Sequence, residues 1–427
     1  MIYKAVLVGF ISLVLFNGVH AQDLQEYIQA AVQNSPLIQD NKNQSEAARL
    51  EADRLKAFYT KSQLSLTASY LFAPIITRDN GKSKLDLNPD SPNNYMGYDV
   101  AASNGGVYQG LLNFNQPLFN TGRYAASAEQ VLIGSQINQN TIQLSIHDLE
   151  RFITDQYILC LQDYRQTEYL LNLIKIITEQ TAIVSKLVDN GIAKQSDLSL
   201  LTIEQKTQQA AYNTFRATYR RDLMDLRVLC GITDTTFQVL PDIKLQLRED
   251  IVTSGFIERY RLDSLNLTAT QKIFELKYKP SVNLFANTGL NAVYAPTIPN
   301  RFGLSAGINF SLNLTDGKQR SISRQRTEVL TKTTTAYKDF FYRQNEVRKG
   351  RILTELQSID ERYTLLQDQL REYVKLLDFY KQELVRGQIS VINYIATLKS
   401  MAASQRDFVV LKTNRETLIN LYNYWNW

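Results

Sequence analysis

Hydrophobic and polar residues alternate strictly along residues 302–315. Seven small or polar residues separate the apolar positions, which are Phe302, Leu304, Ala306, Ile308, Phe310, Leu312 and Leu314. A strand places these two classes on opposite faces, whereas a helix would scatter them around its axis. Alternation also marks residues 64–72, 107–118 and 281–290. The pattern therefore predicts four strands, each with one apolar face.

Two very long stretches of the chain contain no proline. All nine prolines lie outside residues 118–240 and 300–427. Because proline inside a helix costs roughly 3 kcal/mol, both stretches are predicted to be helical. We expect helices over 123–190 and about 318–386, each ending at a glycine and followed by a returning helix. A helix of nearly 70 residues rises roughly 100 Å, far more than a helix of a globular domain.

The second long helix carries a regular apolar seam. Ten apolar residues follow one another in steps of four and three: Ile352, Leu356, Ile359, Tyr363, Leu366, Leu370, Tyr373, Leu377, Tyr380 and Leu384. A period of 3.5 residues sustained over several heptads is typical of a coiled coil. We therefore expect this helix to pack lengthwise against a neighbouring helix.

The same order of elements occurs twice along the chain. An opening helix, two strands and a long helical hairpin are predicted in residues 22–231 and again in 263–427, with a mixed connector over 232–262. Residues 74–106 contain three prolines and many polar residues, and they are predicted to form a long polar loop. The expected fold is mainly α-helical, with four strands per copy of the chain.

Four strands cannot close a barrel, since membrane barrels made from one chain start near eight strands. A sheet with one apolar face and two open edges is also prone to aggregate. The strands are therefore expected to be pooled between copies. Two, three or four copies would give eight, twelve or sixteen strands.

The first 21 residues have the features of a secretory signal peptide. Lys4 precedes an apolar core over residues 5–16, and a small-x-Ala sequence ends at Ala21. The apolar run is shorter than the roughly 20 residues that a spanning helix needs. We expect the mature chain to begin at Gln22, to contain no transmembrane helix, and to enter a membrane only through its strands.

Charge and composition disfavour several function classes. The 47 basic and 42 acidic residues are spread along the helices, which is typical of solvated surfaces and not of a nucleic-acid site. His147 is the one histidine after the signal peptide, and no zinc-ligand spacing, phosphate-binding glycine loop or nucleophile elbow occurs. We expect no enzymatic activity, no metal, no cofactor and no nucleic-acid partner. Spacing leaves open whether Cys160 and Cys230 pair, although two buried free thiols are the simpler interpretation.

Three features of the sequence resemble the TolC family of outer membrane efflux proteins. A strand ends in a tight turn into a long helix at residues 116–123, which contain Pro117 and Gly122, and again at 312–318, which contain Gly317. Pro280 opens a strand after an opening helix. The break between paired long helices places Asp197 six positions after Gly191 and Asn393 six positions after Gly387.

The resemblance extends from about residue 24 to the C-terminus. It implies a homotrimer in the outer membrane that extends into the periplasm, with twelve strands in one barrel and twelve long helices in a coiled-coil tunnel. The implied function is a passive exit duct of a tripartite efflux or type I secretion system. The helix turns at 191–197 and 387–393 would meet a periplasmic adaptor protein and, with it, an inner-membrane pump.

The resemblance also implies roles for individual residues. Apolar strand faces would contact outer membrane lipid, and five asparagines would line a wet lumen: Asn113, Asn115, Asn283, Asn309 and Asn313. Some family members carry acidic residues six and nine positions after the second glycine, where this chain has Asn393 and Ala396. Any acidic ring at the tunnel entrance is therefore expected to come from Asp197. The alternative is that Asp197 only caps a helix.

A secreted periplasmic coiled-coil scaffold or adhesin without channel activity is the alternative function. It would need no detergent, but it leaves the four alternating strands unexplained. The sequence does not identify the cargo, although the scarcity of histidine and methionine weighs against a metal-dedicated system.

Overall fold

A computed structural model describes residues 23–72, 75–86, 95–96, 106–249, 254–293 and 295–427. The predicted signal peptide lies outside this part of the chain. The chain forms two compact units. The sheet unit contains residues 40–142 and 256–340, and the hairpin unit contains the chain up to residue 39, residues 143–255 and residues 341–427. Each unit thus draws on both halves of the sequence, and the division into two repeats stays a prediction about chain order.

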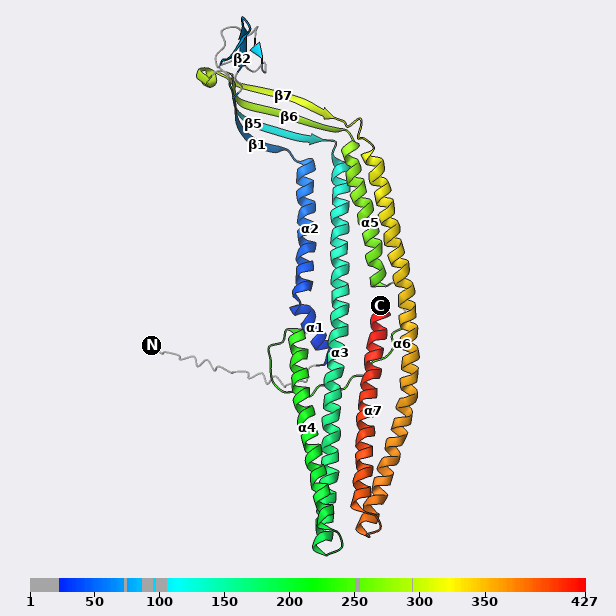
Figure 1. Ribbon diagram of the computed structural model, residues 1–427. Coiled ribbons are helices and arrows are strands. Elements are labelled where there is room, and N and C mark those ends of the chain that lie inside the picture. The colour runs from blue at the N-terminus through cyan, green and yellow to red at the C-terminus, as the bar shows by residue number, and fades with distance from the viewer. Residues whose placement is uncertain (1–22, 73–74, 87–94, 97–105, 250–253, 294) are drawn as a thin grey trace, which may run out of the picture. The chain divides into compact units, whose positions relative to one another are not determined.

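The sheet unit is built on four antiparallel strands (Figure 1). They are β1 (Gln63–Phe72), β5 (Gly106–Leu118), β6 (Ser281–Ala292) and β7 (Phe302–Ser311). Their order in the sheet is β1-β5-β6-β7, so each strand pairs with the next of the four along the chain, although three long helices separate β5 from β6. All four predicted strands are confirmed, although β7 ends at Ser311, before the end of the alternation.

Each of the four strands adjoins a helix. The helix α2 (Pro36–Thr60) precedes β1, and α3 (Thr121–Asp189) follows β5. The helix α5 (Gly255–Glu275) and the short 3-10 helix η2 (Leu276–Tyr278) precede β6, and α6 (Gln319–Val385) follows β7. Another 3-10 helix, η3 (Ala295–Asn300), lies between β6 and β7. The helix α5 begins at Gly255, inside the segment 232–262 that was predicted to be a mixed connector.

The prediction of a polar loop over residues 74–106 was wrong in part. This segment contains β2 (Ile75–Asp79), β3 (Lys82–Asp86) and β4 (Tyr95–Met96), which form a second sheet in the order β3-β2-β4. Asn80 (φ 49°) and Gly81 (φ 77°) connect β2 to β3. Two consecutive residues with positive φ are the signature of the two-residue hairpin turn that Asn-Gly favours.

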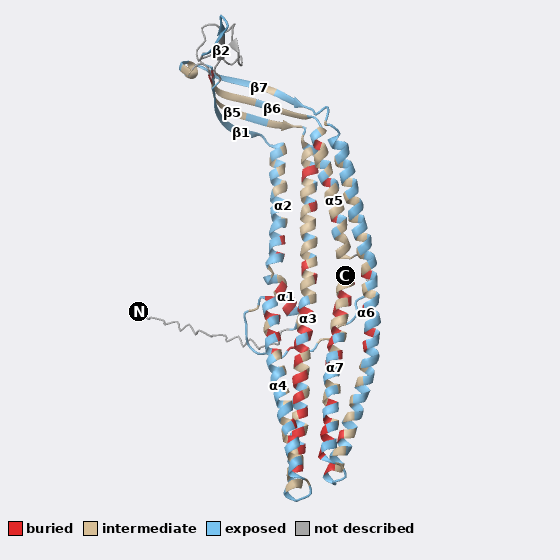
Figure 2. Ribbon diagram, viewed as in Figure 1, coloured by how far each residue is buried: buried red, intermediate tan, exposed pale blue. Residues whose placement is uncertain are grey.

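The hairpin unit consists of paired long helices. The helix α4 (Gln195–Cys230) returns along α3, and α7 (Val391–Trp425) returns along α6 (Figure 1). One apolar core joins side chains of all four helices, among them Leu173, Leu201, Leu377 and Leu398. All ten residues of the predicted seam on α6 are buried or half-buried, which confirms the seam. Figure 2 shows further buried residues along the lower parts of α3, α4 and α7. None of the described helices is long and apolar enough to cross a membrane.

A second core lies where the short helix α1 (Leu24–Asn34) packs on α3 and α4. It includes Tyr27, Tyr157 and Leu226, none of which is more than 1% exposed. Cys160 and Cys230 are both buried there as free thiols, as the simpler interpretation of the sequence expected. Burial raises the pKa of the Cys230 thiol to about 12, so this cysteine stays protonated and unreactive.

The segment that follows α4 has no regular secondary structure over residues 232–249 but is fixed by side chains. The Tyr157 hydroxyl donates to the Pro241 carbonyl at 2.8 Å, and the Tyr219 hydroxyl donates to the Gln238 carbonyl at 2.7 Å. Arg165 binds both carboxylate oxygens of Glu416 at 2.8 and 2.9 Å and also pairs with Asp242. These bonds tie the connector to α3, α4 and α7.

Gly289 offers a direct test of the sheet. Its φ is 148°, and a Cβ atom there would lie 2.1 Å from the Gly110 carbonyl oxygen of the paired strand. Since both groups are backbone, we expect Gly289→Ala to destabilise the β5–β6 pairing by more than about 2 kcal/mol. Heat-induced loss of strand signal in circular dichroism would measure this.

The matched control is Gly303→Ala on the neighbouring strand. Gly303 lies directly opposite Gly289, yet a Cβ atom there would have no neighbour within 4 Å. This variant should melt within a degree or two of the parent. Equal stability of both variants would contradict the register described here.

Candidate functional site

The register of the sheet gathers polar residues on one face. Asn113 lies opposite Ser65 on β1 and opposite Asn287 on β6, and Asn287 lies opposite Ser305 on β7. The Asn113 amide donates to the Thr67 hydroxyl at 2.8 Å, and Ser305 donates to Asn287 at 2.6 Å. Hydroxyls and amides thus form a hydrogen-bonded layer across the four strands.

Four of the five asparagines predicted to line the lumen lie on this face. Asn115 is two residues from Asn113 on β5, and Asn283 pairs directly with Asn309. Asn313 differs, because β7 has already ended and its amide donates to the Lys277 carbonyl at 2.9 Å. The structure therefore places Asn313 at the junction of strand and helix and not on the strand face.

The opposite face of the sheet is apolar and exposed. It carries Leu66, Phe302 and Leu304, whose exposed fractions are 77%, 72% and 78%. None of the four strands contains a lysine, arginine, aspartate or glutamate. An uncharged sheet with one apolar and one amide-rich face is suited to separate lipid from water.

The two strand-to-helix turns use residues with positive φ. In the first turn Pro117 lies opposite Asn283, and the pairing with β6 ends one residue later at Leu118. Phe119 (φ 58°) then precedes α3, whose first turn contains Gly122. In the second turn Gly317 (φ 57°) and Lys318 (φ 70°) precede α6. A bulky residue such as Phe119 rarely adopts this conformation, so the first turn is strained.

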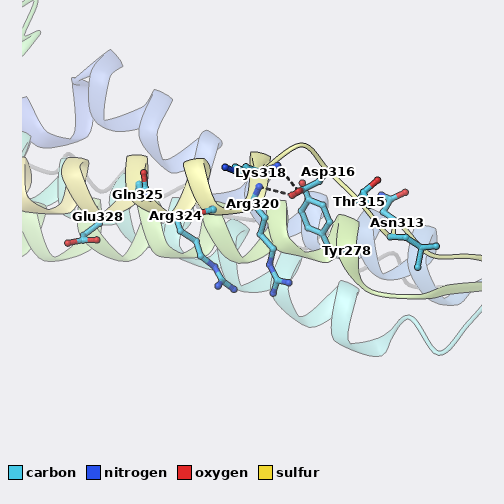
Figure 3. A pocket seen from close by; sticks show the side chains of 11 residues that line it. Tyr278, Asn313, Thr315, Asp316, Lys318, Arg320, Arg324, Gln325 and Glu328 are labelled. Carbon is cyan, nitrogen blue, oxygen red and sulfur yellow. Dashed lines mark hydrogen bonds between the residues drawn. The ribbon is translucent and has the colours of Figure 1, made fainter.

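Charged groups hold the second turn together (Figure 3). The Asp316 carboxylate accepts the backbone N–H groups of Lys318 at 3.0 Å and Arg320 at 2.8 Å, and these bonds lower its pKa. Arg324 and Arg320 bind Glu275 of α5 at 2.5 and 3.3 Å. The ion pair with Arg324 is the main reason that the pKa of Glu275 falls to about 2.

The helices α3 and α6 end in the same backbone motif at the two turns of the hairpin unit. Gly191 and Gly387 have φ values of 74° and 71°. The N–H of Ile192 donates to the Leu187 carbonyl at 2.8 Å, and that of Gln388 donates to the Glu383 carbonyl at 2.9 Å. This left-handed glycine cap satisfies the last carbonyls of α3 and α6 and reverses the chain.

The two returning helices begin differently. At the start of α4 the Asp197 carboxylate accepts the Lys194 backbone N–H at 3.3 Å, so Asp197 is the third helical residue and not the N-cap. At the start of α7 the Ser390 hydroxyl accepts the Asn393 backbone N–H at 3.3 Å. Asp197 and Asn393 are thus both the third residue of their helix, while only the first turn presents a carboxylate.

An ion pair joins the two hairpins above these turns. Lys399 of α7 binds Glu204 of α4 at 2.9 Å, and the Glu204 side chain is only 4% exposed. Gln208 also donates to Glu204 at 2.8 Å. The pairing of α4 with α7 therefore includes a buried carboxylate whose charge is neutralised from the opposite hairpin.

Sequence analysis missed a buried pair of carboxyl groups, Asp163 of α3 and Asp222 of α4. Each residue is 3% exposed. Burial is the main cause that raises the pKa of Asp163, and the hydrogen bond and charge of Asp222 raise it further. Arg221 binds Asp222 at 2.9 Å. No sequence motif marks this pair, because it depends on the register between two helices.

The four-stranded uncharged sheet and the paired long helices define the fold of outer membrane channels of the TolC family. The chain matches the outer membrane protein VceC of Vibrio cholerae over 94% of its own length and 96% of that chain, with a TM-score of 0.69 and 16% identity. It matches the outer membrane channel CmeC of Campylobacter jejuni over 95% and 86%, with a TM-score of 0.67 and 11% identity.

The open state of the MtrE outer membrane channel of Neisseria gonorrhoeae matches over 94% of this chain and 88% of that one, with a TM-score of 0.65 and 13% identity. No protein-family model and no curated protein matches the sequence. At these identities the likeness is one of fold. The fold that the sequence resemblance implied is therefore confirmed over nearly the whole chain.

The Asp163–Asp222 pair generates a prediction about pH. A carboxyl group with a raised pKa in the folded state holds its proton after the unfolded chain has lost it. The contribution of Asp163 to the stability of the folded protein is complete below the ordinary carboxyl pKa of 3.8. It is lost as pH rises through the raised pKa of the folded state. We expect Asp163→Asn, whose amide can still donate to Asp222, to be more stable than the parent at pH 8 by on the order of 1 kcal/mol and to show a flatter pH dependence.

Thermal unfolding between pH 4 and pH 8 would measure this difference. Asp225→Asn provides the control, because Asp225 lies on α4 three residues after Asp222 and is exposed. A pH dependence of Asp163→Asn identical to that of the parent would contradict the raised pKa of Asp163.

Proposed function

We propose that this protein is an outer membrane exit duct, the passive channel of a tripartite efflux or type I secretion system. The observation that carries the proposal is the sheet. Its strands are uncharged, one face is apolar and exposed, and the other face is lined by amides and hydroxyls. The fold shared with outer membrane channels supports the same conclusion.

Strand length supports a location in the membrane. The four strands contain 10, 13, 12 and 10 residues, and a tilted strand needs roughly 9–11 residues to cross the hydrocarbon core. The outer edges of β1 and β7 have no strand partner among the described residues. Edges of this kind are satisfied when copies join edge to edge. We propose a homotrimer with a twelve-stranded barrel, as the family resemblance implies.

We further propose that the helix turns bind a periplasmic adaptor protein that connects the duct to an inner-membrane pump. Each turn presents an exposed isoleucine beside its glycine or cap, Ile192 at 65% and Ile392 at 59%. Exposed apolar side chains at the end of an otherwise polar hairpin are suited to contact the apolar seam of a partner's helices.

Cell fractionation followed by mass measurement in mild detergent tests the proposal. We expect the full chain in the outer membrane fraction, extracted only by detergent, with a particle mass near three times that of the mature protomer. A periplasmic monomer or dimer that needs no detergent would refute the channel and favour a coiled-coil scaffold or adhesin.

Single-channel recording tests the role proposed for Asp197. Three copies of this half-buried carboxylate would form a ring that favours cations. We expect Asp197→Asn to bring the cation-to-anion permeability ratio closer to one. Asp189→Asn, at the exposed C-terminal end of α3 before the same turn, is the control and should change the ratio less. Strong cation selectivity that survives Asp197→Asn would show that the carboxylate acts only at the helix start.

A further inference from the structure

Positive charge borders the end of the four-stranded sheet at which the strands join the long helices. Because the strands are antiparallel, β1 and β6 begin at this end and β5 and β7 finish there. Gln63 lies opposite Asn115, and Ser281 lies opposite Ser311. Five cationic residues flank the strands there and are called the basic rim: Lys61, Arg123, Lys277, Lys279 and Lys318.

The charges of the basic rim are not neutralised within the described chain. None of the five residues forms an ion pair there, whereas the nearby Lys272, Arg320 and Arg324 do. Arg123 donates to the carbonyl of Lys279 at 2.7 Å, which orients its guanidinium but leaves its charge. The four lysines are exposed. The one carboxylate in the adjoining turns, Asp316, is held by two backbone N–H groups at the start of α6.

A hollow of about 480 Å³ opens beside the rim between η2 and the start of α6 (Figure 3). Lys318, Arg320 and Arg324 line it together with the hydroxyls of Tyr278 and Thr315. The carboxylates Asp316 and Glu328 line it too, but Asp316 is held by backbone N–H groups and Glu328 pairs with Lys332. Cationic groups and hydroxyl donors around one hollow are the chemistry that recognises a phosphate group.

The apolar surface next to the rim indicates where that phosphate comes from. The exposed apolar face stops at this end of the sheet, and Phe119, which is 89% exposed, lies in the turn beside Arg123. An aromatic and several cations at the border of an apolar band are typical of the headgroup level of a bilayer. Basic residues just outside the hydrocarbon core attract anionic lipids.

We propose that the basic rim binds the phosphate headgroups of acidic phospholipids in the leaflet at the helical side of the sheet. This inference rests on the proposed membrane location. It adds a lipid specificity that a channel does not require, since an uncharged sheet would also be stable in a neutral bilayer.

Native mass spectrometry of the full chain in mild detergent tests this proposal, with phosphatidylglycerol and phosphatidylcholine as probes. We expect the parent protein to retain phosphatidylglycerol in preference to phosphatidylcholine. A variant with Lys61→Gln, Lys277→Gln, Lys279→Gln and Lys318→Gln should bind phosphatidylglycerol roughly tenfold or more weakly, and phosphatidylcholine equally.

The matched control removes the same charge from exposed lysines elsewhere: Lys42→Gln, Lys206→Gln, Lys244→Gln and Lys381→Gln. It should retain the preference of the parent. Equal binding of both lipids by the parent would overturn the proposal. Equal loss of phosphatidylglycerol binding in the rim variant and the control variant would overturn it too. Dissociation of the oligomer in the rim variant alone would overturn it too, because the lysines would then pair with carboxylates of a second copy.

Two further arms separate the remaining alternatives. Inorganic phosphate at constant ionic strength should not displace phosphatidylglycerol; displacement at millimolar concentration would assign the rim to a free anion and overturn the lipid proposal. If the protein leaves the outer membrane only in detergent but binds phosphatidylglycerol no better than phosphatidylcholine, this inference alone is overturned. If the protein needs no detergent, the proposed function is overturned as well.

Discussion

The open edges of the four-stranded sheet are the constraint on which the rest of the structure depends. In the order β1-β5-β6-β7, the outer backbone groups of β1 and β7 have no partner strand in the described chain. Unpaired backbone groups are costly in a membrane, where water cannot satisfy them. Four strands are also too few for the sheet to close into a barrel. The proposed joining of copies edge to edge would resolve both problems, so this proposal rests on the backbone before any side chain is considered.

The same sheet sets the direction of the helices. Because the strands are antiparallel, β1 and β6 begin at the same end of the sheet at which β5 and β7 finish. The helices α2, α3, η2 and α6 connect to the sheet at this end. The tight turns demand positive φ at Phe119 and Lys318, although neither residue is glycine. Backbone strain of this kind persists only where the surrounding contacts hold it. Here Asp316 bonds to the start of α6, and Arg123 bonds to the chain before β6.

Most of the fold could be predicted from sequence because its signals are long and periodic. Alternation over ten residues and an apolar seam over ten positions leave little ambiguity about strand or helix. The small sheet after β1 was missed because its strands of five, five and two residues are too short to show that alternation, although Asn80-Gly81 is a recognised hairpin signal. The pairs Asp163–Asp222 and Glu204–Lys399 could not be predicted, since their contacts depend on the exact register between helices.

The two halves of the chain are alike in backbone and different in chemistry. Gly191 and Gly387 adopt nearly the same φ, and the residue six positions later is the third residue of a helix in both cases. The turn requires a glycine, but it accepts either Asp197 or Asn393 in the first turn of the helix, because neither position is fully buried. The geometry of the tip is therefore fixed by the chain reversal, while its charge is free to vary. Differences in ion preference or partner choice between channels of this fold are best sought at such helix starts.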